Sequence, residues 1–192
     1  MRHGEPVGGR RYRGQRDDPL SQNGWRQMWD KIGGCAPWQI LISSPLSRCR
    51  AFADELATHR QLPLEVVDDL KEVGFGVWEG LTRDEVKAGC PGLYASYLAD
   101  PVGARPAGAE PLEAFYRRVA AALESLAQRH AGRHVLVVCH AGVIRMALAW
   151  ALGVPLANAY RIQVASAALT RLAVEGNDTD LRARLVFHDG RL

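Results

Sequence analysis

The sequence predicts an α/β protein, a three-layer sandwich in which a mostly parallel central sheet is flanked by helices. Two observations predict this class. Strand-like apolar runs alternate with segments of helical periodicity along the 192 residues. One run, residues 135–139, is continuously apolar, which is typical of a parallel strand buried on both faces. The length suits one core, so residues 1–192 are expected to form a single domain.

The predicted elements follow one another from the first third of the chain. Apolar residues at helical spacing predict a helix from Ser21 to about Ile32 that Gly33 closes. Residues 39–43 form a short apolar run of strand type, and an Arg-rich helix over about 46–59 follows it. The later elements are a short helix opened by a capping box at 82–85, a long helix from Pro111 to about His130, a helix over about 143–152, and strands over 162–174 and 184–187.

Composition excludes several function classes. The net charge is only +3, and no apolar run approaches the length of a membrane span or a signal peptide, so a cytoplasmic protein with no membrane partner is expected. The cysteines lack Cys-x-x-Cys spacing, which argues against a zinc site or a disulfide framework and favours reduced thiols; they are Cys35, Cys49, Cys90 and Cys139.

A cluster of arginines near the N-terminus leaves three interpretations open. It consists of Arg10, Arg11, Arg13 and Arg16 in a Gly-rich segment that reads as an irregular loop. The cluster could bind nucleic acid, line an anion pocket, or be a solvated loop. The small net charge does not favour nucleic acid.

The first residues, Arg2-His3-Gly4-Glu5, place a guanidinium beside an imidazole. Arginine grips phosphate oxygens in a bidentate fork, and a neutral histidine nitrogen can attack phosphorus. Gly4 is expected to allow a sharp turn where a phosphate could sit. Taken alone, the tetrad is equally compatible with a solvated terminus.

Basic residues also follow two predicted strands. Arg48 lies just after the first strand, and His140 and Ala141 come just after the second, each near the start of a helix. Ligands of such sheets bind beyond the carboxyl ends of the strands, and helix N-termini favour anions. These residues are therefore candidates for binding phosphate. The alternatives are a core histidine and an ordinary helix-surface arginine.

The segment 71–80 carries the remaining candidate chemistry. Its glycines and tryptophan surround two acids, Glu72 and Glu79. Glu72 could act as a general acid whose pKa is raised by burial. The alternative is that both acids are solvated loop charges.

Six motifs in this order resemble the histidine phosphatase superfamily, whose members are phosphoglycerate mutase-like phosphatases and mutases. The resemblance covers the chain almost end to end. The motifs are residues 2–5, Arg13-Gly14 with 18–21 and Gly24, residues 43–48, Glu72 with 75–76 and 78–80, residues 108–110 with Phe115 and 118–119, and residues 139–145.

The resemblance implies a role for each matched residue. His3 is implied as the nucleophile that forms a phosphohistidine, and Glu72 as the acid that protonates the leaving oxygen and then activates water. The groups implied to hold the phosphoryl oxygens are Arg2, Arg48 and His140, and those implied to bind substrate are Arg13, Gly14 and Ala141. The implied substrate is a small phosphomonoester, with no metal or other cofactor and no nucleic acid.

Within the superfamily, the first loop and the last motif resemble those of α-ribazole phosphatases, which act in cobalamin synthesis. Tyr12, Trp78 and the stretch 101–111 are candidates for contacting the organic part of the substrate, with a place in the core as the equal alternative for the two aromatic residues. The alternatives are a broad-specificity sugar or nucleotide phosphatase, a phosphoglycerate mutase, and an inactive regulatory domain. The short chain favours a phosphatase, and the complete set of implied catalytic residues favours an enzyme.

Two departures from the family's pattern affect the expectations. An asparagine that is frequent soon after the signature is absent, and the chain has residues Pro6 to Gly9 there instead. The resemblance also implies an apolar strand ahead of Arg2, and this sequence starts at Met1. The fold is therefore expected to lack its first strand, either through a misassigned start or through a true absence.

Overall fold

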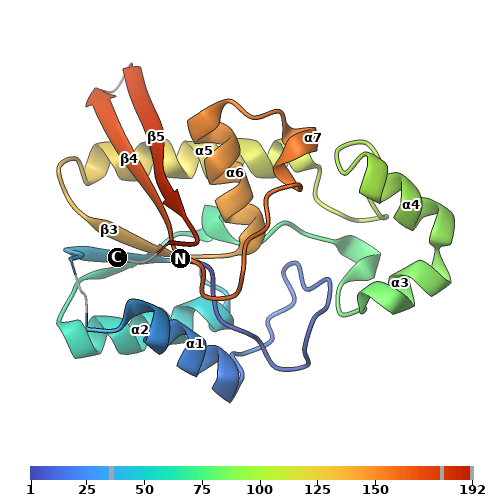
Figure 1. Ribbon diagram of the computed structural model, residues 1–192, viewed down its shortest axis with the longest axis horizontal. Coiled ribbons are helices and arrows are strands. Elements are labelled where there is room, and N and C mark those ends of the chain that lie inside the picture. The colour runs from blue at the N-terminus through green and yellow to red at the C-terminus, as the bar shows by residue number, and fades with distance from the viewer. Residues whose placement is uncertain (35–36, 178–179, 191–192) are drawn as a thin grey trace.

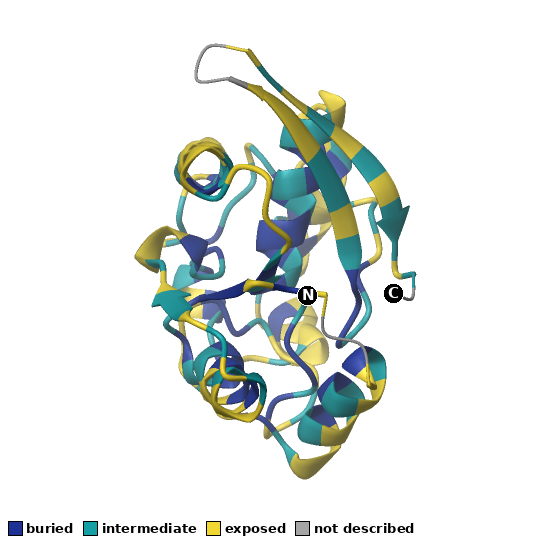
Figure 2. Cartoon of the chain, turned by 90° about the vertical axis from the view of Figure 1, so that its left-hand side faces the viewer, coloured by how far each residue is buried: buried dark blue, intermediate teal, exposed yellow. Residues whose placement is uncertain are grey.

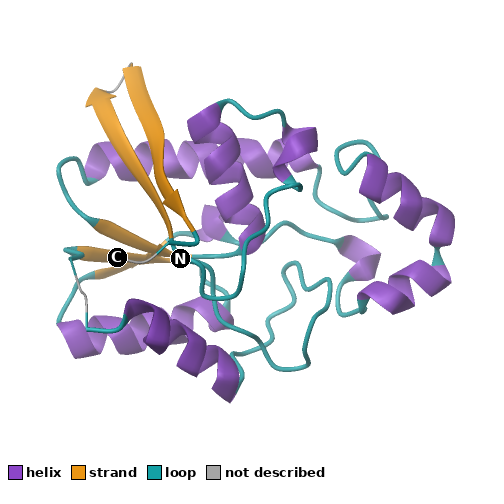
Figure 3. Cartoon of the chain, in the orientation of Figure 1, coloured by secondary structure: helices purple, strands orange, loops and turns teal. Residues whose placement is uncertain are grey.

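The central sheet has three parallel strands in the order β2-β1-β3 (Figure 3). They are β1 (Ile40–Ser43), β2 (Leu64–Val66) and β3 (Val135–Val138). The computed structural model describes residues 1–34, 37–177 and 180–190. β1 is buried along its whole length because it lies between the two other strands. The predicted strands at 39–43 and 135–138 are confirmed.

Helices cover both faces of this sheet, which confirms the predicted three-layer class (Figure 1). α1 (Gln22–Ile32) and α2 (Ser47–Arg60) lie on one face, and α5 (Leu112–Arg129) and α6 (Ala141–Leu152) on the other. Two apolar cores result, with Leu41 in the first and Ile42 in the second, because successive strand residues point to opposite faces. The predicted helices in these four regions are confirmed to within about two residues.

Shorter elements link the layers. They are 3₁₀ turns η1 (Asp68–Leu70) and η2 (Gly76–Trp78), and helices α3 (Arg83–Gly89), α4 (Pro91–Ala99) and α7 (Leu156–Ala159). The predicted capping box is present, since the Thr82 side chain accepts from the Glu85 amide and the Glu85 carboxylate accepts from the Thr82 amide. None of the helices in the described part of the chain is both long and apolar enough to span a bilayer.

An antiparallel hairpin, β4 (Thr170–Asn177) with β5 (Asp180–His188), ends the described chain. The strand predicted over 162–174 is therefore wrong in its first half. Ala167 has φ 57°, which turns the backbone out of the extended conformation. The Ala167 amide donates to the His3 carbonyl at 3.2 Å. This segment therefore bonds to the N-terminal residues and does not extend the hairpin.

Residues Met1 to His3 lie along the edge of β3 over a very short length. The Cys139 amide donates to the Met1 carbonyl and the His3 amide donates to the Cys139 carbonyl, both at 2.9 Å. On the other side, the Arg2 amide donates to the Ala168 carbonyl. A single bridge, between Arg2 and Cys139, therefore joins this segment to the edge of β3.

A largely apolar groove of about 780 Å³, with Met1 among its lining residues, separates β3 from β4. Val135 and Val137 line it and are only partly buried, while Leu136 and Val138 are buried. The prediction that residues 135–139 form a strand buried on both faces is thus wrong on this side, because no strand covers it. Figure 2 shows the same openness in the neighbouring hairpin, where partly buried and exposed residues alternate.

Candidate active site

His3 lies at the carboxyl end of the sheet, beside the end of β3, and is 5% exposed. Its Nδ1 is 2.7 Å from the Gly4 carbonyl oxygen, an acceptor, so Nδ1 carries the proton and Nε2 keeps its lone pair. Gly4 has a different role from the turn expected of it. A Cβ there would lie 2.1 Å from the Gly24 carbonyl oxygen, so Gly4 lets the N-terminal segment pack against the start of α1.

His140 follows β3, precedes the first residue of α6 and is fully buried. Its ring centroid lies 5.2 Å from that of His3. Its Nε2 is 2.7 Å from the Ser44 hydroxyl, and the Cys49 thiol packs 3.6 Å from the same nitrogen. Two strand ends therefore meet at the histidine pair, as the topology requires.

Two arginines face this pair. Arg48, the second residue of α2, is 1% exposed and donates from Nη1 to the Arg16 carbonyl and from Nη2 to the Gly14 carbonyl, both at 2.8 Å. Arg2 donates from Nη1 to the Val164 carbonyl at 2.7 Å. The Nε groups of both arginines are buried and have no acceptor within the described residues. A phosphoryl oxygen is a suitable acceptor for such groups.

Burial and positive charge keep the histidine pair neutral. Burial is the main cause that lowers the pKa of His3 well below 6.5, and Arg48 and Arg2 lower it further. The pKa of His140 is lowered well below 6.5 by burial and then by Arg48. An unprotonated imidazole keeps a nitrogen lone pair that is free to act as a nucleophile, and in His3 it lies beside two cations.

Glu72 lies between η1 and η2 and reaches the N-terminus of α6. Its Oε2 accepts from the Gly142 amide at 3.1 Å, and its Oε1 accepts from the Val73 amide at 3.0 Å. A Cβ on Gly142 would lie 2.1 Å from Oε1, so glycine is needed for this approach. The helix N-terminus beside Ala141, expected to receive an anion, thus receives the protein's own carboxylate.

The Gly-rich loop supports Arg48, and three of its four arginines hydrogen-bond to groups in the loop or beside it. Arg13 donates to Asp18 and to the carbonyls of Val7 and Gly9, so it organises the loop. Gly14 has φ +55° and presents its carbonyl to Arg48. Of the remaining arginines in the cluster, Arg11 donates to the carbonyls at Gly8 and Gly80, and Arg16 to Asp18.

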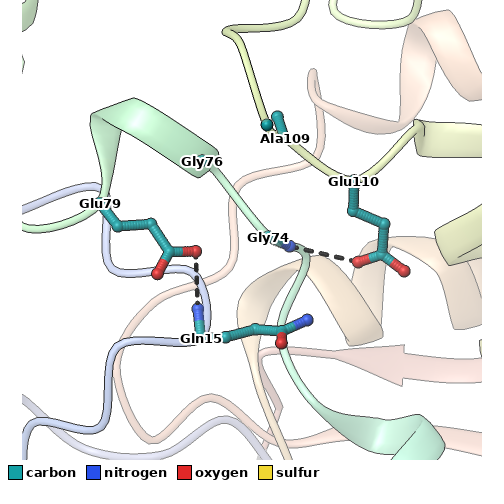
Figure 4. A pocket seen from close by; sticks show the side chains of 7 residues that line it. Gln15, Gly74, Gly76, Glu79, Ala109 and Glu110 are labelled. Carbon is teal, nitrogen blue, oxygen red and sulfur yellow. Dashed lines mark hydrogen bonds between the residues drawn. The ribbon is translucent and has the colours of Figure 1, made fainter.

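Sequence reasoning gave Glu79 no role beyond a possible loop charge, and the structure makes it an anchor. Its carboxylate accepts from the amides of Gln15, Arg16 and Phe75 at 2.9–3.1 Å. Figure 4 shows it reaching across to Gln15, beside a pocket of about 410 Å³. The available signal in the sequence was that Glu79 belongs to the motif at residues 78–80. Glu79 therefore ties the acid segment to the loop that holds Arg48.

Glu110 fastens the other side of the acid segment and also escaped the sequence reasoning. Its Oε2 accepts from the Gly74 amide at 3.2 Å (Figure 4). Arg118 holds the same carboxylate with two bonds of 2.7 and 2.8 Å and also donates to the Glu72 carbonyl. The position of Glu72 is therefore set by a partly buried ion pair as well as by its own bonds.

The expected substrate contact by Trp78 is contradicted. Trp78 is 2% exposed and packs against Tyr12 and Tyr97, with ring centroids 5.2 Å apart in both pairs. It is a core residue.

Tyr12 is partly buried in the same aromatic cluster, and burial raises its pKa to about 12. Loop 101–111 is bonded to the acid segment, since the Val77 amide donates to the Ala107 carbonyl at 3.0 Å.

The histidine, arginine and glutamate arrangement agrees with a comparison of the whole sequence with protein families. The model of the histidine phosphatase superfamily (branch 1) matches residues 1–185. The chain belongs to the histidine phosphatase superfamily. The family model shows the superfamily of this chain and not an individual substrate.

The curated relatives of this chain carry names that point to different activities. A bifunctional protein of Mycobacterium tuberculosis is 36% identical over all of this chain and 54% of its own length, so the chain spans about half of that relative. Phosphoserine phosphatase 1 of Hydrogenobacter thermophilus is 31% identical over 82% of this chain and 77% of its own. The adenosylcobalamin/α-ribazole phosphatase of Escherichia coli is 28% identical over 81% and 78%.

Solved structures show the same fold. A mycobacterial glucosyl-3-phosphoglycerate phosphatase superimposes with a TM-score of 0.82 at 27% identity, covering 96% of this histidine phosphatase and 94% of the other chain. The three cysteines that the structure describes, Cys49, Cys90 and Cys139, are free thiols, as expected, while Cys35 lies outside the described residues.

Proposed function

We propose that this chain hydrolyses phosphomonoesters through a covalent phosphohistidine at His3. One observation carries the proposal: the Nδ1 proton of His3 is engaged by the Gly4 carbonyl, which directs the free lone pair of Nε2 away from that bond. Around it stand buried arginine donors with no acceptor. The membership in the superfamily supports the same reading.

In the first step, Nε2 of His3 attacks phosphorus and the bond from phosphorus to the ester oxygen breaks. The protonated carboxyl form of Glu72 gives its proton to that oxygen, which leaves as an alcohol. Arg2, Arg48 and His140 bind the three equatorial oxygens, whose charge they stabilise in the transition state. Arg13, Gly14 and Ala141 shape the surroundings of the phosphoryl group, Arg13 through the loop it organises.

In the second step, water attacks phosphorus and gives a proton to the Glu72 carboxylate, and the bond to Nε2 breaks. Phosphate leaves, His3 regains its neutral form, and Glu72 is protonated again for the next cycle. Side chains of the protein stabilise every charge that develops in this scheme, so we expect turnover without a metal ion.

Two classes of substrate are candidates. α-Ribazole 5′-phosphate, with a role in cobalamin synthesis, is supported by the likeness to the Escherichia coli enzyme. Phosphoesters of acids are supported by the likeness to the phosphoserine and glucosyl-3-phosphoglycerate phosphatases. A broad-specificity phosphatase and a mutase are the remaining catalytic alternatives.

The test measures phosphate release from p-nitrophenyl phosphate, α-ribazole 5′-phosphate and 3-phosphoglycerate in the presence of a strong chelator. The variants are His3→Ala and, as a matched control, the exposed His134→Ala. We expect chelator-resistant turnover that His3→Ala abolishes and His134→Ala leaves intact, with an acid-labile phosphoryl group trapped only when His3 is present. Absence of turnover from the wild-type chain would favour a regulatory domain, and rescue by Mg²⁺ would overturn the metal-free scheme.

A further inference from the structure

Four arginines around the reaction centre have no carboxylate within 4 Å in the described part of the chain. They are Arg2, Arg48, Arg105 and Arg145. The proposed function uses two of them, Arg2 and Arg48, on the phosphoryl group. Arg105 and Arg145 are left without an anion, although unpaired guanidinium groups in a partly buried place are costly.

Arg105 comes from the loop 101–111 and lies against the acid segment. Its Nη2 donates to the Gly74 carbonyl at 3.0 Å, and its guanidinium carbon is 5.3 Å from the centre of the Phe75 ring. Nε and Nη1 are shielded from water and make no hydrogen bond of good geometry within the described residues. A buried donor in this state is destabilising, which favours an acceptor brought by a ligand.

Arg145 approaches from α6, one turn beyond Ala141. Its Nε donates to the Ile162 carbonyl at 3.0 Å, and its guanidinium carbon lies 5.2 Å above the Tyr160 ring. This bond and stacking fix the plane of the guanidinium. No described residue accepts from its two terminal nitrogens, so a bidentate face remains available.

Tyr160 connects the two arginines. Its ring stacks against the Arg145 guanidinium, and its hydroxyl is buried. Burial raises the pKa of Tyr160, and the charge of Arg105 and a hydrogen bond with Arg105 oppose this rise. Arg105 also donates to the Gly74 carbonyl, two residues beyond Glu72, so the two arginines border the acid segment. We call these residues the Arg105–Arg145–Tyr160 cluster.

The cluster lies close to the place that the leaving group would occupy. In the proposed function Glu72 protonates the leaving oxygen, so the organic part of the substrate begins beside Glu72 and next to the cluster. We propose that the Arg105–Arg145–Tyr160 cluster binds a carboxylate on the organic part of the substrate. This inference rests on the proposed function and selects phosphoesters of acids over the uncharged riboside.

The test uses substrate pairs that differ only in the carboxylate. O-Phosphoserine is compared with O-phosphoethanolamine, and 3-phosphoglycerate with 2-hydroxyethyl phosphate, by kcat/KM. α-Ribazole 5′-phosphate and p-nitrophenyl phosphate complete the set. The variants are Arg105→Gln and Arg145→Gln, and the exposed Arg161→Gln is the matched control that removes the same charge from a neighbouring segment.

We expect the wild-type chain to prefer the carboxylate-bearing member of each pair by about 10-fold or more. Arg105→Gln and Arg145→Gln should lower that ratio about 10-fold, mainly through KM, and Arg161→Gln should leave it unchanged. Equal rates within both pairs, or a preference for α-ribazole 5′-phosphate, would overturn the inference while leaving the phosphatase intact. Failure to hydrolyse every ester, p-nitrophenyl phosphate included, would overturn the proposed function and the inference together.

Discussion

At the scale of single residues, the histidine pair links catalysis to stability. The folded-state pKa values of His3 and His140 both lie well below the ordinary 6.5, chiefly through burial. Below about pH 6.5 the unfolded chain therefore binds protons that the folded chain does not, and the free energy of unfolding falls as pH falls. For both groups the slope approaches about 2.7 kcal/mol per pH unit.

This dependence is measurable by urea unfolding between pH 7 and pH 5. We expect His3→Asn to flatten the slope by about half, because one of the two depressed groups is gone. His134→Asn, which removes an exposed histidine, should leave the slope unchanged. Equal slopes for the wild type and His3→Asn would contradict the neutral, buried state of His3.

Arg48 offers a second test at this scale, because its shape matters as well as its charge. Arg48→Lys keeps the charge but cannot hold the Gly14 and Arg16 carbonyls and an oxyanion together. We expect kcat/KM for p-nitrophenyl phosphate to fall about 100-fold. Arg50→Lys in the same helix, where the side chain pairs only with Asp54 near the surface, should change it less than about 2-fold. A loss of less than about 2-fold in Arg48→Lys as well would show that Arg48 acts only by its charge.

The residue scale is also where sequence reasoning reached its limit. Residue types and motif order were enough to name His3 and Glu72, since chemistry restricts what can stand there. The surroundings were not readable, because contacts between distant segments decide them. Trp78 was expected at the substrate and lies in the core, since four aromatic rings pack there. Arg105 was seen only as part of a loop.

At the scale of elements, the acid segment and the Gly-rich loop act as one unit through Glu79. Its carboxylate is the acceptor for three backbone amides, at Gln15, Arg16 and Phe75. Glu79→Ala leaves those amides unbonded and frees the loop whose carbonyls hold Arg48. We expect kcat/KM to fall about 10-fold or more and amide exchange at residues 15 and 16 to accelerate.

The control for this prediction is Glu113→Ala, which removes an exposed carboxylate from α5. Glu113→Ala should change neither kcat/KM nor the rate of amide exchange at residues 15 and 16. Unchanged exchange in Glu79→Ala would mean that the loop is held by Arg13 and Asp18 alone. A loss of activity without faster exchange would give Glu79 a role in the chemistry instead of in positioning.

The same scale explains which elements were predictable. Helices with a clear apolar stripe, such as α1, and the strands of the parallel sheet follow from local periodicity. The strand wrongly predicted to begin at Ile162 shows the opposite case, because residues 162–169 are mostly apolar yet bond to the N-terminal segment. Their conformation depends on a partner more than 150 residues away, which no local pattern contains.

At the scale of the whole molecule, the groove between β3 and β4 separates the three-stranded sheet from the two-stranded hairpin. It is lined by apolar side chains, among them Val135, Val137 and Leu172. The amino group of Met1 lies at its end, donating to the Val137 carbonyl at 2.7 Å. Burial lowers the pKa of this amino group, so holding it inside as an ammonium at pH 7 costs stability.

A six-residue extension ahead of Met1, alternating Val and Ile, should therefore stabilise the molecule. It would turn the buried ammonium into an ordinary amide, place apolar side chains in the groove, and give the edge of β3 a hydrogen-bonding partner. We expect the Tm at pH 7 to rise by about 4 °C or more. An extension of six Gly and Ser residues removes the same charge without filling the groove, so it separates the two effects. If both extensions raise the Tm equally, the charge alone matters, and if neither does, the groove does not accept a strand.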